Sequence, residues 1–276
     1  MVERAIRDSS SKTGASSDST AWTDHDLAGD PHAKADKAHR VQRMFSAIAS
    51  SYDLNNRLHS LGRDQAWRRA AVKLAAVQPG DTVLDVACGT GDLTLAFADG
   101  GAGRVLGSDF TLAMLKRARA KAHAHGCDAN ANGGGVGAGV DFHAADALCL
   151  PLADASVDVV SIAFGIRNVT DSAAALGEFY RVLKPGGRVI VLEFGLPRNR
   201  LLRAGYDFYF NHVLPRTASL VARDRSGAYR YLPRSVHTFL DRPGMERLIA
   251  DAGFEAVTSR ALTFGIAIAY RGVKPG

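Results

Sequence analysis

The sequence predicts an α/β fold in which a doubly wound, mostly parallel sheet is covered by helices on both faces. The main observation is the run from Thr82 to Leu93, where a short apolar segment ends in the turn Cys-Gly-Thr-Gly and a helical pattern follows. Apolar runs rich in β-branched residues then alternate with helical patterns, as in sheets built from strand–helix–strand units. Two strand patterns near the end of the chain, joined by a tight connection, predict an antiparallel pair.

The composition is that of a globular protein. The chain has 276 residues, 46% of them hydrophobic, and a net charge of +6. No window approaches the roughly 18 apolar residues of a membrane-spanning helix, and the N-terminus lacks an apolar leader. The three cysteines, Cys88, Cys127 and Cys149, fit neither a zinc site nor a disulfide framework. We therefore expect a cytoplasmic protein without a metal ion.

The first part of the chain divides into a polar tail and the start of the folded domain. Residues 1–38 are rich in Ser, Thr, Asp and Lys and show no periodicity, which predicts a disordered tail before a domain at 39–276. A helix is expected next, because Val41, Met44, Phe45 and Ile48 recur at helical spacing. After a break at 50–53, Asp64 is predicted as the N-cap of a helix that continues to Ala76.

The remaining elements follow from the alternation of patterns. Strands are predicted to begin at residue 82 and to span 104–109, 140–144, 157–164, 188–194, 255–262 and 265–271. Helices are predicted at 112–122, 173–183 and 243–252. The glycine-rich segment 126–139 is expected to be a flexible loop. Residues 198–240 form additional helical material that a plain α/β repeat does not require.

The glycine turn and the next strand predict a nucleotide-containing ligand. Glycine at positions 89 and 91 lets a ligand approach the backbone and permits positive φ. Asp109 ends the second strand, 18 residues after Gly91, where a carboxylate can accept bonds from both ribose hydroxyls. A dinucleotide pattern needs a third glycine where Thr94 stands, so a nicotinamide cofactor is disfavoured.

The carboxyl ends of the predicted strands should gather the candidate site residues around one cleft. These residues are Gly89, Thr90 and Gly91 of the turn, Asp109, Asp146 after the third strand, and residues 164–168 after the fourth. Asp146 could instead cap a helix, Thr90 could serve only its own turn, and Arg167 could pair with a surface acid. The sequence leaves these alternatives open.

Several motifs together resemble those of one family. Asp85-x-x-Cys-Gly-Thr-Gly is similar to motif I of class I S-adenosylmethionine-dependent methyltransferases. Tyr52-Asp53-x-x-Asn56, Phe164-Gly165-x-Arg167-Asn168 and the Lys-Pro-Gly-Gly run within residues 180–194 resemble the quinone-ring C-methyltransferases of menaquinone and ubiquinone biosynthesis, the UbiE/MenG/COQ5 family. The resemblance covers about residues 38–272.

This resemblance implies the class I methyltransferase fold and S-adenosyl-L-methionine as cofactor. The implied cofactor-binding residues are Asp85, Gly89, Thr90, Gly91, Asp109, Asp146, Ala147 and Ala163, with Asp146 on the adenine amine. Family members usually carry a serine where Ala163 stands, an acid where Arg57 stands and often a histidine where Asp64 stands. Ala163 can therefore offer only its backbone to the cofactor.

The family resemblance also implies the reaction, which is C-methylation of demethylmenaquinol or of a methoxy-benzoquinol. Arg167 is the candidate for stabilising a phenolate, and Asn168 for orienting the ring. His212 is the candidate general base and Tyr206 a weaker one, although His212 could equally be a packed helix residue.

The positive charge is concentrated in one stretch. Residues 198–234 contain eight arginines and two aspartates, interleaved with aromatic residues, which indicates an interaction surface, with a solvated face as the alternative. Because a polyprenyl tail lies in the bilayer, we expect peripheral contact with the membrane surface.

Nucleic acid is not expected, since the Asn/Asp-Pro-Pro-aromatic element of amino-methylating enzymes is absent after the fourth strand. An inactive partner in a biosynthetic assembly remains an alternative, and homo-oligomerisation is left open.

Overall fold

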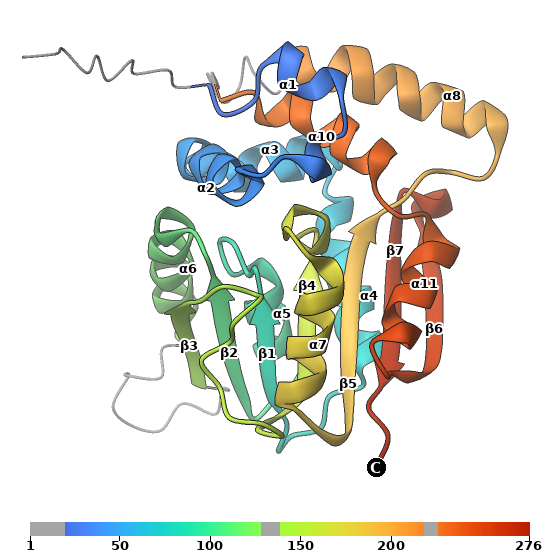
Figure 1. Cartoon of the computed structure of the whole chain (residues 1–276). Coiled ribbons are helices and arrows are strands. Elements are labelled where there is room, and N and C mark those ends of the chain that lie inside the picture. Colours follow the sequence, from blue (N-terminus) through green and yellow to red (C-terminus); the bar gives the residue numbers. More distant parts are fainter. Residues whose placement is uncertain (1–19, 128–138, 218–225) are drawn as a thin grey trace, which may run out of the picture.

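A seven-stranded sheet organises the computed structural model, which describes residues 20–127, 139–217 and 226–276. The strand order is β3-β2-β1-β4-β5-β7-β6, and the five strands from β3 to β5 are parallel (Figure 1). The strands are β1 (Thr82–Val86), β2 (Arg104–Asp109), β3 (Gly139–Ala144), β4 (Val157–Ala163), β5 (Leu183–Phe194), β6 (Glu255–Leu262) and β7 (Ala267–Val273). This order confirms the predicted doubly wound sheet of the class I methyltransferase fold.

The two closing strands form the predicted antiparallel pair. Strand β7 runs antiparallel to β5 on one side and to β6 on the other. Strand β5 is longer than the predicted 188–194, because the Lys-Pro-Gly-Gly segment belongs to it rather than to a loop. Its first residue, Leu183, pairs with Val157, and the register shifts before the pairing resumes at Val159. The strand therefore accommodates the proline and glycines at an irregularity.

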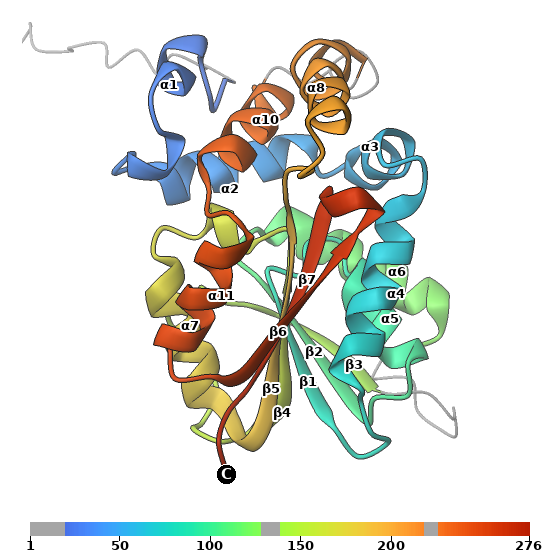
Figure 2. The ribbon, with the colours of Figure 1, turned by 90° about the vertical axis from the view of Figure 1, so that its right-hand side faces the viewer.

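Helices cover both faces of the sheet (Figure 2). On one face lie α4 (Arg63–Ala75), α5 (Asp92–Asp99) and α6 (Leu112–His125), and on the other lie α7 (Ser172–Val182) and α11 (Arg242–Asp251). Each face has its own apolar core, and the central strands β1 and β4 contribute to both cores, as expected for strands buried on both sides. Because the five strands β3 to β5 are parallel, their carboxyl ends lie together at one edge of the sheet.

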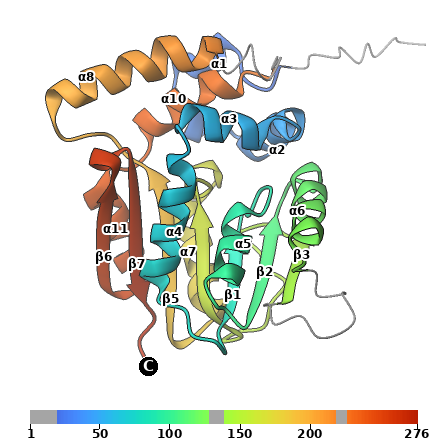
Figure 3. The same cartoon turned by 180° about the vertical axis from the view of Figure 1, so that it is seen from behind.

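A layer of further helices lies over that edge (Figures 1 and 3). It comprises α1 (Asp24–Ala28), α2 (Lys37–Ile48), α3 (Tyr52–His59), α8 (Arg200–Phe208), a π-helical turn at Tyr209–Val213 and α10 (Ala228–Thr238). A third apolar cluster joins residues of this layer that are far apart in sequence, including Trp22, Met44, Phe210 and Tyr231. The described part of the predicted helical subregion at 198–240 thus belongs to the layer that covers the carboxyl ends of the strands. Its residues 218–225 lie outside the described residues.

The N-terminal prediction is wrong for residues 20–38. This segment contains α1, a 3₁₀ turn at Pro31–Ala33 and the start of α2, and Trp22 has no exposed surface. Thr23 and Asp26 form a capping box, in which each side chain accepts from the other residue's backbone N–H. The segment needs no core of its own because it packs against α10. Residues 1–19 are outside the described residues.

One further prediction is wrong, and another falls mostly outside the described residues. Asp64 does not cap α4; Gly62, at φ +72°, occupies the N-cap position, and Asp64 lies in the first turn with its carboxylate accepting from Ser60. Most of the glycine-rich segment, residues 128–138, lies outside the described residues. Within the described residues no helix is long and apolar enough to cross a membrane.

Candidate functional site

Two adjoining cavities lie between the carboxyl ends of the strands and the helical layer. The first is lined by strand-end residues that include Gly89, Asp109, Asp146, Ala147 and Ala163. The second has a volume of about 490 Å³ and is mostly apolar. Three aromatic residues line both cavities: Phe45, Tyr52 and Phe164. A ligand in one cavity can therefore meet a ligand in the other across this aromatic boundary.

Asp109 is the fixed acid of the first cavity. Its Oδ2 accepts from the Gly89 backbone N–H at 2.8 Å, and its Oδ1 accepts from the Thr111 N–H at 2.7 Å. Burial raises the pKa of Asp109, although both backbone bonds oppose that shift. Gly89 has φ +57°, and a Cβ there would face Tyr52 at the cavity wall. This combination of an anchored carboxylate and a bare backbone fits a ribose-bearing ligand.

The residues predicted for the adenine end also line the first cavity. Asp146 is exposed, and its Oδ1 accepts from the Leu148 N–H at 3.0 Å, so it stabilises its own turn as well as facing the cavity. Ala147 and Ala163 contribute small walls, which leaves room for a flat ring. Phe110 lines the same cavity and is 46% exposed, so its ring is available for stacking.

Asp85 does not line either cavity. Its side chain is 1% exposed, and it accepts from the Thr94 hydroxyl and the Ser161 hydroxyl, each at 2.7 Å. Burial raises its pKa to about 6, against the effect of these two hydrogen bonds. Asp85 thus ties the start of α5 to strand β4.

Thr90 and Gly91 also lie outside the first cavity. The Thr90 hydroxyl donates to Asp53 Oδ1 at 2.6 Å and accepts from Lys121 at 3.2 Å. Gly91, at φ +83°, forms the N-cap of α5, and a Cβ there would approach Phe142 to 3.1 Å. The Thr90 hydroxyl therefore contacts α3 and α6 rather than only its own turn, and Gly91 fixes the start of α5.

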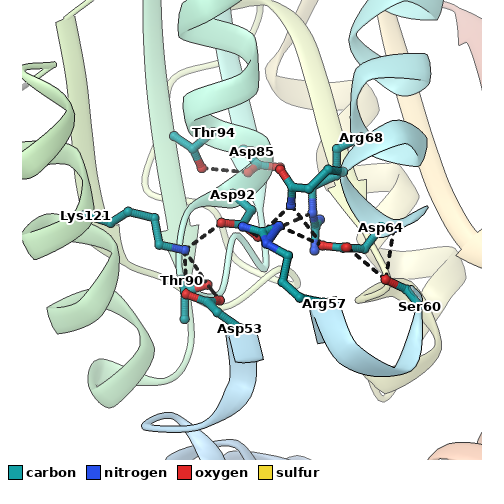
Figure 4. Close-up of polar contacts among 11 residues, drawn as sticks. Asp53, Arg57, Ser60, Asp64, Arg68, Asp85, Thr90, Asp92, Thr94 and Lys121 are labelled. Carbon is teal, nitrogen blue, oxygen red and sulfur yellow. Dashed lines mark hydrogen bonds and ion pairs between the residues drawn. The ribbon is translucent and has the colours of Figure 1, made fainter. Parts of the chain in front are cut away.

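A network of ion pairs connects the cofactor loop to helix α3 (Figure 4). Lys121 of α6 lies 2.7 Å from Asp53 Oδ2 and 2.6 Å from Asp92 Oδ1, so it joins α3, α5 and α6. Arg57 extends the network toward α4: its Nη1 lies 3.2 Å from Asp64 and its Nη2 lies 3.5 Å from Asp92. Several charges converge here beside the glycine turn, and two of them, Asp53 and Lys121, bond directly to the Thr90 hydroxyl.

Arg167 has a defined place in the wall of the second cavity. Its Nη1 donates to Glu193 Oε1 and to the Phe164 carbonyl, both at 2.7 Å, and its Nε donates weakly to Ser235 at 3.4 Å. Among the described residues, its Nη2 has no hydrogen-bond partner. The buried pair with Glu193 excludes the surface-acid alternative and orients the guanidinium.

Asn168 lies beside Arg167 but lines the first cavity. Its Nδ2 donates to the Phe164 carbonyl at 3.3 Å, and its Oδ1 accepts from the Tyr231 hydroxyl at 3.0 Å. Phe164, at φ +56°, therefore presents one carbonyl to both Arg167 and Asn168. The segment directly after β4 therefore holds both Arg167 and Asn168 at the boundary between the cavities.

The two candidate bases lie in different places. Tyr206 lines the second cavity, its hydroxyl is buried without a partner among the described residues, and burial raises its pKa. His212 is exposed, stacks on Phe208, and lines neither of these two cavities. That placement counts against His212 as a general base.

Sequence reasoning missed one histidine that does line the second cavity. The Nδ1 of His59 lies 3.0 Å from the Tyr209 hydroxyl, which also donates to the His59 carbonyl at 3.3 Å. Its Nε2 is buried without a partner among the described residues, and burial lowers its pKa. The only available signal was its position near Tyr52-Asp53, seven residues along the same predicted segment. In the described ranges no cluster of His, Cys, Asp and Glu could hold a metal ion.

Comparisons with known proteins agree with this geometry. A profile of the ubiE/COQ5 methyltransferase family matches residues 33–274. The ubiquinone/menaquinone biosynthesis C-methyltransferase UbiE of Escherichia coli is 43% identical over 244 residues, 88% of this chain and 93% of its own, and that of Shigella boydii matches equally.

Solved structures share the fold at lower identity. A Thermotoga maritima S-adenosylmethionine-dependent methyltransferase has a TM-score of 0.58 and 20% identity, over 84% of this chain and 99% of its own. A Haemonchus contortus phosphoethanolamine N-methyltransferase, solved with S-adenosylmethionine, has a TM-score of 0.55 and 16% identity, over 76% of this chain and 52% of its own. With the family profile covering most of its length and the first cavity fitting the cofactor, the chain belongs to the ubiE/COQ5 family and is an S-adenosylmethionine-dependent methyltransferase.

Proposed function

We propose that this protein methylates a ring carbon of a reduced polyprenyl quinol, with demethylmenaquinol as the principal acceptor. The names of its relatives cover both ubiquinone and menaquinone biosynthesis, so they support the class of acceptor rather than one ring. The observation that carries the proposal is the placement of Arg167. A cation with one free nitrogen faces a large apolar cavity that adjoins the cofactor cavity.

The residues divide the work between the cavities. Gly89, Asp109 and Asp146 would hold S-adenosylmethionine, which supplies an electrophilic methyl group on its sulfonium. Phe164, Phe194 and Tyr206 would enclose the quinol ring in the second cavity. In this reaction the S–CH₃ bond would break as a ring carbon bonds to the methyl group, S-adenosylhomocysteine would leave, and the proton of the ring C–H bond would be released. Alignment of the two reactants across the aromatic boundary supplies much of the rate enhancement expected for such a transfer.

Arg167 and His59 have complementary tasks in this proposal. Loss of the quinol hydroxyl proton makes the adjacent ring carbon nucleophilic, and Nη2 of Arg167 would stabilise the resulting oxyanion. His59 would accept that proton, because its lowered pKa keeps the imidazole neutral near pH 7. If the Tyr209 hydroxyl donates to the His59 carbonyl, Nδ1 carries the ring proton and Nε2 is the basic atom.

Turnover with a panel of acceptors tests this function. Methyl-labelled S-adenosylmethionine is incubated with the full chain and with reduced demethylmenaquinone, a reduced methoxy-benzoquinone analogue, or RNA. We expect label on the naphthoquinol, less on the benzoquinol and none on RNA. Equal transfer to both quinols would make the enzyme dual-purpose, and labelled RNA without labelled quinol would overturn the proposal.

We further propose that the acceptor reaches the second cavity from the surface of the cytoplasmic face of the membrane. Helix α8 exposes Leu201 and Phe208, with Arg200 and Arg203 beside them in sequence, a combination that suits an anionic lipid surface. Leu61, which is 87% exposed, lines the second cavity and so places an apolar side chain at its opening. The prenyl tail could then remain in the bilayer while the ring enters.

Vesicle co-sedimentation tests the membrane contact. The wild-type chain should bind vesicles that contain anionic phospholipid, and binding should weaken at high salt. Charge reversal of Arg198, Arg200 and Arg203, or Leu201→Glu with Phe208→Glu, should reduce binding at least tenfold. Unchanged binding by both variants would refute this part of the proposal.

A further inference from the structure

The N-terminal segment at residues 20–37, which we call the strap, lies across α10 and ends at the strand exit that carries Arg167 and Asn168. Helix α1 of the strap lies beside α10 in Figures 1 and 2. The backbone N–H groups of Ala21 and Trp22 both donate to the Ser226 carbonyl, at 2.9 and 3.0 Å. Most of the strap, residues 20–32, precedes the part of the chain that matches the family profile.

Trp22 connects the strap to the acceptor site. Its indole has no exposed surface and stacks on Tyr231, with ring centroids 4.5 Å apart and planes inclined by 21°. Tyr231 lines the second cavity, and its hydroxyl donates to Asn168 Oδ1 at 3.0 Å. A chain of direct contacts therefore runs from Trp22 through Tyr231 to Asn168, which is at the boundary between the cavities.

Two further contacts fix the other end of the strap. Lys37 is 2% exposed, and its ammonium donates to the carbonyl of Val169 at 2.6 Å. Val169 is the residue directly after Asn168. His32 Nε2 lies 3.0 Å from the Ser235 carbonyl, and the hydroxyl of the same Ser235 accepts from Arg167 Nε. The strap thus contacts the immediate neighbours of both residues of the Arg-Asn pair.

Residues of α2 and of the start of α10 contact the strap closely. Arg40 of α2 donates to the Ala21 carbonyl at 3.0 Å and to Asp26 at 2.9 Å, and its guanidinium lies over the Trp22 ring, 5.5 Å from the centroid. At the start of α10, a Cβ on Gly227 would come within 2.3 Å of the Trp22 carbonyl oxygen, so the backbones approach closely. Trp22 is held in a place shaped for it, between a cation and an aromatic ring.

We propose that the strap is a positioning element for methyl transfer, and that Trp22 is its principal positioning residue. By holding the Tyr231 ring, Trp22 fixes the hydrogen bond to Asn168 and hence the alignment of the acceptor with the first cavity. The inference rests on the proposed quinol function for its kinetic consequence only. Since displacement of a reacting group by about 1 Å can cost about a hundredfold in rate, loss of the stack should lower kcat.

The test compares Trp22→Ala with two other variants of the full chain. Trp22→Phe keeps a stacking ring and should retain at least half of kcat. Trp22→Ala should lower kcat at least tenfold, while the Kd for S-adenosylmethionine changes less than twofold. Phe254→Ala, which removes a buried ring that lines neither of the two site cavities, should lower the melting temperature without a comparable fall in kcat.

A double-mutant cycle shows whether Trp22 acts through Tyr231. Tyr231→Phe removes the hydroxyl bond to Asn168 but keeps the stack. If the contact chain is the route, the effects of Trp22→Ala and Tyr231→Phe on kcat are strongly non-additive. Additive effects, or a Trp22→Ala variant with unchanged kcat, would overturn the proposal.

Hydrogen exchange separates this proposal from the proposed function. In Trp22→Ala, amides of residues 165–171 and of α10 should exchange at least tenfold faster, while those of β1 and α5 remain unchanged. This result needs no turnover, so it holds even if the wild-type chain fails to methylate quinols. Exchange that rises uniformly across the sheet, or not at all at 165–171, would contradict a positioning role.

Discussion

At the scale of single residues, the two charged departures from the family pattern contact each other. Arg57 stands where an acid is usual and Asp64 where a histidine is common, and the structure places Arg57 Nη1 3.2 Å from Asp64 Oδ2. In this chain the two side chains form an ion pair between α3 and α4. Arg57 also lies near Asp92, so the reversal connects this pair to the cofactor loop.

His59 and His212 give the sharpest contrast between residues of one type. We expect His59→Gln to lower kcat by about one to two orders of magnitude, because a positioned general base contributes about that much or more. The matched variant His212→Gln should keep kcat within twofold, since this side chain is exposed and lines neither site cavity. The pH dependence of kcat for both variants is the measurement. A larger loss for His212→Gln would restore it as the base.

Asp85 should make stability depend on pH in the acid range. Its folded pKa of about 6 lies above the ordinary value of 3.8, so the folded state holds the proton more tightly. Its contribution to the free energy of unfolding is therefore greatest below pH 4 and falls as the pH rises through 6. Chemical denaturation from pH 4 to 7 should show wild type losing stability relative to Asp85→Asn. A constant difference across that range would contradict the buried, protonatable state.

At the scale of elements, the sequence predicts those helices and strands whose formation depends on local residue patterns. Strands β1 to β4 and helices α6, α7 and α11 follow from apolar periodicity and from Gly and Pro, so their bounds agree within a few residues, whereas β5 begins at Leu183 rather than at residue 188. Asp64 satisfied the N-cap pattern, but Gly62 took the position because the preceding turn required φ +72°. The composition of the strap predicts disorder, whereas its one tryptophan is buried by α10, some two hundred residues later in the chain.

Lys121 should couple helix α3 to cofactor binding. It joins Asp53, Thr90 and Asp92, and it is only 27% exposed. Loss of these two partly exposed ion pairs costs about 0.4–2 kcal/mol in total, at about 0.2–1 kcal/mol for each exposed pair. Lys121→Ala should therefore weaken S-adenosylmethionine binding about three- to tenfold by calorimetry, whereas Lys116→Ala, on an exposed face of the same helix, should not. Equal affinities in both variants would show that α3 is not coupled to the loop.

At the scale of the whole molecule, the acceptor cavity is the part that sequence reasoning could not assemble. The strand-end rule located Gly89, Asp109 and Asp146 around one cleft, because parallel strands share an edge. The second cavity draws on residues from Met44 to Ile266 that only the folded helical layer brings together. The family motif implies a cofactor role for Asp85 and Thr90; in the structure their side chains bond to residues of neighbouring elements, and neither residue lines the two cavities.

One measurement tests the central claim most directly, namely that Arg167 sits at an acceptor site for carbon methylation. Single-turnover transfer is followed with saturating ¹³C-methyl S-adenosylmethionine and reduced demethylmenaquinone, for wild type and for Arg167→Lys, which keeps a charge beside Glu193. We predict a ring-carbon methyl in the wild-type product, and transfer about a hundredfold slower in Arg167→Lys with an unchanged cofactor Kd. A methyl group on oxygen, or equal rates for the two proteins, would contradict the account.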